Sequence, residues 1–208
     1  MAAPARLARW SPRLGWLAGA VPAVWLAVRI ATDGLGAEPI EEATHITGFS
    51  ALSLLMATLA VSPLRRATGW NGLIGARRSL GLCAFGYACV HFAIYLLDQN
   101  FAVAYIVEDV AERWWVTVGF TALLLLLPLA ATSTRAAIRR MGKRWQKLHR
   151  LVYLAAGLGV LHFFLLVKED VRQPVIFAVI LGVLLALRLP LRRLAAVPRR
   201  ETRPNQAT

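Results

Sequence analysis

The sequence predicts an all-α membrane protein built from six transmembrane helices. Of its 208 residues, 58% are hydrophobic and only 17% are charged, whereas a soluble domain carries charge on about a quarter of its residues. Several windows are almost free of charge over about 18 residues, which is the length a helix needs to cross a bilayer. Basic and acidic residues also alternate from loop to loop along the chain, as the loops of a multi-pass protein do.

The apolar windows define six candidate spans: Leu14–Ile30, His45–Leu64, Leu80–Leu97, Trp114–Ser133, Leu151–Val167 and Val175–Leu189. The last two are short for a span, so we expect them to extend into their flanks. Residues 14–190 then form one helical bundle, between an N-terminal segment at 1–13 and a C-terminal tail at 191–208. This organisation leaves no room for a second folded domain.

The loop charges predict which side of the membrane each loop faces. The second-to-third and fourth-to-fifth loops are basic and contain no acid. Ten of the 11 acidic residues fall in the other three loops. Because Lys and Arg stay cytoplasmic, the basic loops and both termini are expected in the cytoplasm, and the acidic loops outside. The net charge of +13 therefore indicates topology and contact with anionic lipid rather than nucleic-acid binding.

Two of the four histidines fall at matching depths in neighbouring spans. His91 lies 13 residues beyond Arg78, and His162 lies 12 residues beyond Arg150. Both spans run outward, so the rise of an α-helix places the imidazoles about 20 Å and about 18 Å from the basic side. An ionisable side chain inside a membrane span is a functional-site candidate. Two imidazoles at one level can bind one metal ion from opposite sides, as haem requires.

The other two histidines are weaker candidates. His149 lies at the basic mouth of the fifth span, 13 residues before His162. That spacing rotates by about 220° on an ideal helix, so the two share a face only if the helix bends or widens. His45 begins the second span near the acidic side. The pattern favours a surface polar group at a helix start for His45, over a role in an outer-side site.

Proton relays and ion-coupled transporters also use intramembrane histidine. Such proteins usually add Asp or Glu at mid-depth, and none of the six spans has one there. The pattern therefore favours electron transfer. A cofactor-free ion or small-solute transporter remains the alternative.

Several segments carry a specific family resemblance. They are Thr44–Gly48, Ser62–Arg65, Arg77–Leu82 leading to Val90–Phe92, Gly142–Tyr153, and Leu161–Phe163. Together they resemble the MsrQ (YedZ) family, and the similarity extends from about residue 14 to residue 190. The segment Gly-Lys-Arg-Trp-Gln-Lys-Leu-His, ending at His149, is the most specific part of it.

The resemblance implies a role. MsrQ proteins are haem-bearing inner-membrane subunits of a bacterial system that repairs oxidised methionine in periplasmic proteins. They pass electrons to a periplasmic molybdopterin reductase, MsrP, which carries out the reduction. Their proposed electron source is the quinone pool, and FMN is described as a further cofactor beside haem b. The resemblance thus implies a b-type haem held by His91 and His162.

A wider resemblance is to the ferric reductase and NADPH oxidase transmembrane domain. That family stacks two haems between its third and fifth spans on four histidines. Here His149 and His162 are present in the fifth span, but the inner position of the third span is Arg77. The difference leaves room for a second haem or a flavin at the inner side. A flavin phosphate could then meet basic residues in this region: Arg77, Arg78, Arg144 and Lys147.

The larger relatives also carry a soluble flavin–nicotinamide domain. Only about 19 residues follow the sixth span here. The resemblance therefore implies that electrons come from quinone or from a separate flavin reductase.

Overall fold

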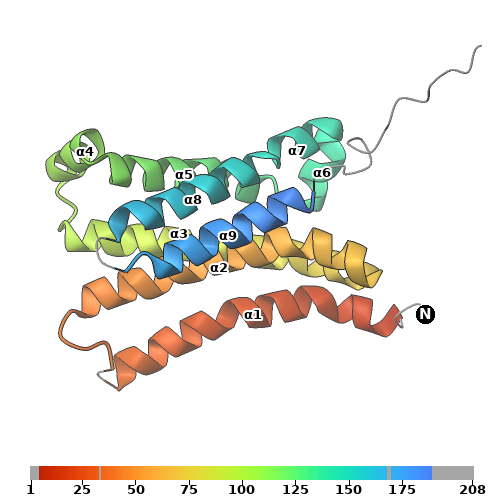
Figure 1. Cartoon of the computed structure of the whole chain (residues 1–208), viewed down its shortest axis with the longest axis horizontal. Coiled ribbons are helices and arrows are strands. Elements are labelled where there is room, and N and C mark those ends of the chain that lie inside the picture. Colours follow the sequence, from red (N-terminus) through yellow and green to blue (C-terminus); the bar gives the residue numbers. More distant parts are fainter. Residues whose placement is uncertain (1–4, 33, 168–169, 189–208) are drawn as a thin grey trace, which may run out of the picture.

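The computed structural model describes residues 5–32, 34–167 and 170–188, with side chains from residue 11 onward. In this part of the chain, the regular elements are all helices (Figure 1). They are α1 (Ala5–Ala31), α2 (Pro39–Thr68), η1 (Asn71–Leu73), α3 (Ile74–Asp98), α4 (Val103–Glu112), α5 (Trp114–Ala131), α6 (Arg135–Met141), α7 (Lys143–Leu148), α8 (Leu151–Leu166) and α9 (Arg172–Ala186). The predicted all-α class is confirmed.

Five helical segments of the described chain are long and apolar enough to cross a membrane, and they match the first five predicted spans. The sixth predicted span corresponds to α9, which has only 15 residues. At 1.5 Å per residue it covers about 22 Å, less than the roughly 30 Å of a hydrocarbon core. The predicted end of this span at Leu189, and the tail at 191–208, lie outside the described residues.

Two boundaries differ from those predicted. α1 begins at Ala5, well before Leu14. α2 begins at Pro39 rather than His45, because proline suits the first turn of a helix and two acidic residues follow it there. His45 is therefore nearly two turns inside the helix, and its interpretation as a helix-start residue is wrong.

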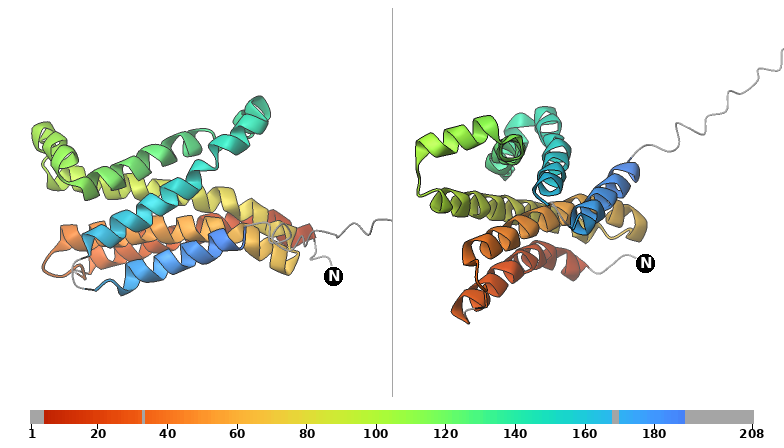
Figure 2. Two further views of the ribbon diagram at one scale, coloured as in Figure 1. Left: turned by 45° about the horizontal axis from the view of Figure 1, so that its top comes forward. Right: turned by 60° about the vertical axis from the view of Figure 1, so that its left-hand side comes forward.

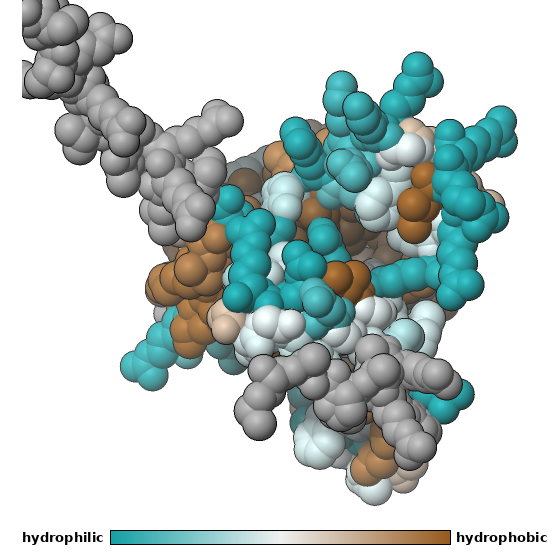
Figure 3. All heavy atoms as spheres, turned by 90° about the vertical axis from the view of Figure 1, so that its right-hand side faces the viewer, coloured by the Kyte–Doolittle hydropathy of each residue, from teal (hydrophilic) through white to brown (hydrophobic). Residues whose placement is uncertain are grey.

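The loops gather at two opposite ends of the bundle (Figure 1). The α1–α2 and α8–α9 connections and helix α4 lie at one end, which we call the acidic end. The α2–α3 connection and the short helices α6 and α7 lie at the other, the basic end. Hydrophilic side chains gather across the basic end (Figure 3). The separation of charge predicted from the sequence is thus present in three dimensions.

The most deeply buried helix is α2, whose residues dominate the core. Leu59 is fully buried there, and α8 contributes Ala155 and Ala156. α1, α2 and α3 lie side by side, while α5 and α8 form a second group that packs against α3 and α2 (Figures 1 and 2). The outer faces of α1, α5 and α9 are largely exposed and apolar, as lipid-facing surfaces are.

Small residues bring α1 and α3 into close contact. A Cβ added at Gly15 would lie 2.0 Å from Ser79 Oγ, and one at Gly19 would lie 2.3 Å from Cys83 Sγ. The Tyr87 hydroxyl donates a 2.6 Å hydrogen bond to the Gly19 carbonyl. Glycine at such positions lets membrane helices approach closely, so this contact fixes α3, the helix that carries His91.

Candidate metal centre

His91 on α3 and His162 on α8 lie next to each other in the structure. Their ring centroids are 6.2 Å apart, and the ring planes are at 88°. α3 and α8 both run from the basic end to the acidic end (Figure 1). Equal distances from the basic end therefore become equal depths, as the sequence predicted.

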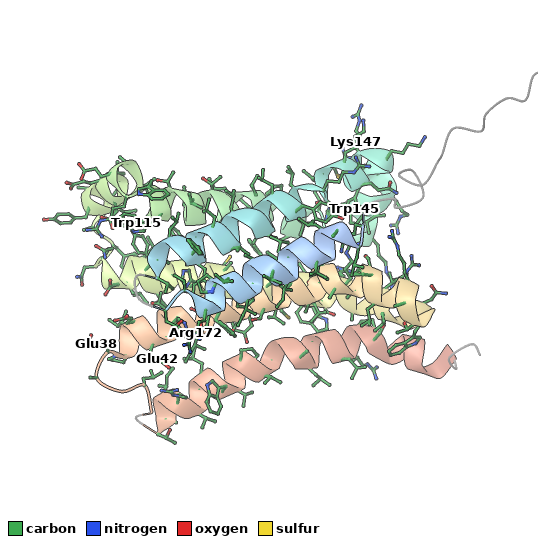
Figure 4. The ribbon with its side chains drawn as sticks, viewed as in Figure 1. Glu38, Glu42, Trp115, Trp145, Lys147 and Arg172 are labelled. Carbon is green, nitrogen blue, oxygen red and sulfur yellow. The ribbon has the colours of Figure 1, made fainter. Side chains whose placement is uncertain are left out.

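Each imidazole is held by a main-chain carbonyl of a neighbouring helix. His91 Nδ1 lies 2.9 Å from the Thr44 carbonyl oxygen on α2. His162 Nδ1 lies 2.8 Å from the Trp115 carbonyl oxygen on α5, at the acidic end (Figure 4). A carbonyl only accepts, so each Nδ1 carries the proton and donates it. Nε2 of both rings is then left with a lone pair for a metal, the usual arrangement for ligating histidine.

A glycine also lies against each imidazole. A Cβ added at Gly48 would lie 3.0 Å from His91 Cε1, and one at Gly119 would lie 2.6 Å from His162 Cε1. Each glycine follows the carbonyl residue by four positions, Thr44 before Gly48 and Trp115 before Gly119. Residues four apart lie on the same face of a helix. α2 and α5 therefore hold their histidines in the same way. Each provides a main-chain carbonyl that accepts a hydrogen bond and a glycine whose missing side chain makes room for the ring.

The spacing of the rings fits a haem iron between them. A metal–imidazole bond is about 2 Å and a ring nitrogen lies about 1.1 Å from the ring centre, so coaxial imidazoles on one metal have centres about 6.2 Å apart. The observed separation is 6.2 Å. No group of three or more His, Cys, Asp or Glu converges among the described residues. Two histidines match haem, because its ring supplies the other four ligands.

His45 does not join this pair. Its ring stacks on Phe49 at 6.1 Å and meets the edge of Phe163 at 6.3 Å. Phe177 of α9 completes the cluster, with its centroid 5.3 Å from Phe49 and 6.0 Å from Phe163. His45 thus belongs to an aromatic contact between α2, α8 and α9. One member of this contact, Phe163, directly follows His162 in the sequence.

His149 lies at the basic end, in the turn between α7 and α8. The helix is interrupted there, since α7 ends at Leu148 and α8 begins at Leu151. The His149 ring stacks on Trp145 at a centroid distance of 3.8 Å, and Trp145 donates to the Thr132 carbonyl at 3.0 Å. His149 Nε2 is buried and has no hydrogen-bond partner in the described structure. The other three histidines, on α2, α3 and α8, belong to the acidic half of the described structure, and the inner position of α3 is Arg77.

The basic residues predicted near this histidine separate into two groups. Arg77 is partly buried and close enough to His149 to interact electrostatically with it. Arg78, Arg144 and Lys147 are exposed, and Lys147 lies on the surface of α7 (Figure 4). A role for these three in binding a flavin phosphate stays a prediction.

Sequence reasoning missed several residues of this region. The carbonyls of Thr44 and Trp115 carry no signal in the sequence, since any residue has a carbonyl. Gly48 and Gly119 were visible but resemble ordinary membrane glycines. Arg188 did carry a signal, because it is the one charged residue in the sixth predicted span, and an intramembrane charge is a functional candidate by itself.

Comparison with known proteins places the chain in a family. Residues 47–160 match the family model described as ferric reductase like transmembrane component. A relative from Rhodospirillum rubrum is 52% identical over 171 residues, 81% of this chain and 82% of the relative. That relative is named protein-methionine-sulfoxide reductase heme-binding subunit MsrQ. The chain belongs to the MsrQ family.

Other MsrQ proteins cover similar lengths. The one from Herminiimonas arsenicoxydans is 49% identical over 178 residues, 84% of this chain and 82% of the relative. The one from Deinococcus radiodurans is 46% identical over 190 residues, 88% of this chain and 94% of the relative. MsrQ membership and five long apolar helices in the described residues together make this a multi-pass membrane protein. The sequence-based recognition of the family is confirmed.

Proposed function

We propose that this chain is a b-type haem electron-transfer subunit of the bacterial inner membrane, with His91 and His162 as the axial ligands. The observation that carries the proposal is the 6.2 Å separation of the two rings, with both Nδ1 atoms engaged by carbonyls. The MsrQ relatives support it, since they are named as heme-binding subunits of a methionine sulfoxide reductase.

The chain's own residues would position and tune the cofactor, and a bound haem would supply one-electron redox chemistry. The Thr44 and Trp115 carbonyls keep both imidazoles in the tautomer with a free Nε2. Because neither histidine is free to rotate, ligation needs little rearrangement. The surrounding apolar helices exclude water and provide the low dielectric that sets a redox potential.

The separation of basic and acidic loops supports an orientation of the chain in the membrane, and this orientation sets the proposed direction of electron flow. The basic end is proposed to face the cytoplasm and the acidic end the periplasm, with both termini inside. Electrons would enter from the quinone pool, or from a cytoplasmic flavin reductase, and leave towards a periplasmic molybdopterin reductase, MsrP. Reduction of one methionine sulfoxide takes two electrons and two protons and yields methionine and water. One quinol supplies two electrons and releases two protons.

The basic end is proposed to hold a second redox group beside His149. That group is FMN or a second haem, with Arg77, Arg78, Arg144 and Lys147 as candidate contacts for an anionic ligand. The buried, unpartnered Nε2 of His149 supports a ligand there.

A two-stage measurement tests the proposed function. The purified chain should show the reduced-minus-oxidised spectrum of a low-spin bis-histidine haem. After reduction by a quinol, it should be reoxidised when the periplasmic reductase and a methionine sulfoxide substrate are added together. A colourless chain that retains its helical circular dichroism would overturn the haem assignment. A haem that is reoxidised equally fast without the reductase would overturn the proposed partner.

A further inference from the structure

A group of inward-facing polar side chains lies at the basic end, one level deeper than the exposed basic loops. The Arg188 guanidinium, just beyond α9, donates to the main-chain carbonyl of Leu59 and to the hydroxyl of Tyr153. Its central carbon lies 5.0 Å from the centre of the Tyr153 ring. Residues from α2, α8 and the end of α9 therefore meet at one point.

Arg77 of α3 lies near enough to this group for its charge to act on it. It is partly buried and interacts electrostatically with both Tyr153 and Arg188. It interacts in the same way with His149. Arg188 and Tyr153 are thus in direct contact, and the charge of Arg77 acts on both of them and on His149 from a helix far away in the sequence.

Among the residues that the structure describes, no carboxylate pairs with this positively charged group. The three ion pairs found among the described residues are Arg29–Glu42, Arg113–Asp109 and Arg172–Asp170, and none of them involves the group. Nε of Arg188 and Nε2 of His149 are buried and have no hydrogen-bond partner in the described structure. An unpaired buried cation is costly without a counter-charge, and a buried polar atom is costly without a partner.

Lipid contact does not explain Arg188. A membrane arginine that serves a headgroup extends its side chain towards the interface. The Arg188 guanidinium instead reaches the carbonyl of Leu59, a residue with no exposed surface. It therefore faces the core of the bundle, where an anion would have to belong to a ligand held between the helices.

We propose that Arg77, Tyr153 and Arg188 bind an anionic oxygen group, a carboxylate or a phosphate, of the redox ligand beside His149. The proposal rests on the proposed function, because it takes the ligand to be a second redox cofactor. The carboxylate would be a propionate of a second haem, and the phosphate would be that of a flavin mononucleotide. Guanidinium groups suit both, since they form paired charge-assisted hydrogen bonds to either.

Arg77 lies beyond the reach of an anionic group bound at the outer site. Arg77 precedes His91 by 14 residues, about 21 Å along α3, and Tyr153 precedes His162 by nine, about 14 Å along α8. The combined length of a haem propionate at His91 and His162 and of the Arg77 side chain falls short of the about 21 Å that separates the two levels. An anion held by Arg77 therefore belongs to a separate ligand at the basic end.

Charge removal in the full-length protein tests this site. Arg188→Met and Arg77→Met keep an unbranched stem and remove the guanidinium charge, Arg188→Lys retains a charge, and Arg66→Met is the control. Arg66 is an exposed arginine at the same end. Haem per chain, acid-released FMN per chain and copurified phospholipid are measured after purification in one detergent. The spectrum of the outer haem reports whether each variant is folded.

We expect Arg188→Met and Arg77→Met to retain about tenfold less of either FMN or the second haem. The outer spectrum should persist, and Arg66→Met should match the wild type. Loss of FMN alone identifies the phosphate source, and loss of one haem alone identifies the carboxylate source. If Arg188→Met does not fold, Arg77→Met and Tyr153→Phe decide by the same criterion.

Three outcomes would overturn the site. They are unchanged FMN and haem in the folded charge-removal variants, a change in phospholipid only, and a wild-type chain with one haem and no flavin. Failure of the proposed function looks different, because the wild-type protein would then lack the bis-histidine spectrum itself.

Discussion

The two ends of the α3–α8 helix pair differ in how they hold a histidine. At the acidic end, His91 and His162 face each other, and each is fixed by one carbonyl and one glycine of a neighbouring helix. At the basic end, His149 stacks on Trp145, and its electrostatic neighbour on α3 is Arg77. The same helix pair therefore offers two imidazoles at one end, and one imidazole and the guanidinium group of Arg77 at the other.

This difference separates two ways of binding a redox group. The acidic end is preorganised for a metal, because ring orientation, tautomer and separation are fixed before any ligand arrives. The basic end lacks a second nitrogen ligand, since arginine does not lose its proton to bind iron. It offers positive charge instead, which suits the anionic groups of a ligand better than its metal.

The largest expected effect is at the acidic end. His91→Ala or His162→Ala should each remove the low-spin spectrum of the outer haem, because each removes one of two axial ligands. Haem retention at that site should fall by more than about tenfold. Optical and electron paramagnetic resonance spectra of the purified variants measure this. A wild-type spectrum in either variant would show that the 6.2 Å pair does not hold the iron.

The membrane topology of the chain also tests the difference between the basic and acidic ends, because each loop lies either inside or outside. Reporter fusions should place the loop Thr134–Arg150 and the tail Ala195–Thr208 in the cytoplasm, and the loop Asp98–Arg113 outside. The physical reason is the retention of Arg and Lys on the cytoplasmic side during insertion. An external tail would rule out the six-span model, and an external Thr134–Arg150 loop would reverse the two ends.

The two glycines beside the histidine rings, Gly48 and Gly119, predict losses of haem of different size. Gly119→Ala should lower outer haem occupancy by about tenfold, because the added Cβ lies 2.6 Å from His162 Cε1 and the Trp115 bond opposes rotation of the ring. Gly48→Ala, at 3.0 Å from His91, should cause a smaller loss of about two- to threefold. Haem per chain and the spectrum of the remaining haem measure both.

Gly157→Ala is the matched control on α8, since a Cβ there meets nothing within 4 Å. Alanine favours helix over glycine by about 1 kcal/mol, so a loss of haem in Gly119→Ala cannot come from a weaker helix. Equal haem content in all three variants would show that the glycines only pack helices.

His149→Ala should leave the outer spectrum intact and slow the reduction of the outer haem. Its ring lies near the start of α8, 13 residues before His162, so its removal does not touch the outer site. Stopped-flow reduction by a quinol or a reduced flavin measures the rate, and we expect a decrease of about tenfold. Unchanged kinetics would assign His149 to interfacial hydrogen bonding. Loss of all haem would mean that it supports the outer site.

The sequence predicted the spans and the proximity of His91 and His162 well, because both depend on simple periodic quantities. Hydrophobic length defines a span, and rise per residue defines a depth. The carbonyls of Thr44 and Trp115 were beyond prediction, since main-chain groups have no sequence identity. The convergence of Arg77, Tyr153 and Arg188 depends on the approach of three helices and on where α9 ends, which periodicity alone does not give.

The smallest effect concerns the exposed charges of the basic end. Arg144 and Lys147 are exposed on α7, where they can attract an anionic donor but bind it weakly. Replacing both by Gln should slow reduction by an anionic flavin donor by about threefold at low salt, and raising the salt should remove the difference. A neutral quinol donor is the control, because its rate should change little in the same variant. Arg77 and Arg188 are inside the bundle, so salt should screen their effect far less. A salt-insensitive loss in the Arg144 and Lys147 variant would therefore mean that these residues contact the bound ligand directly, and that the site at the basic end extends to the surface of α7.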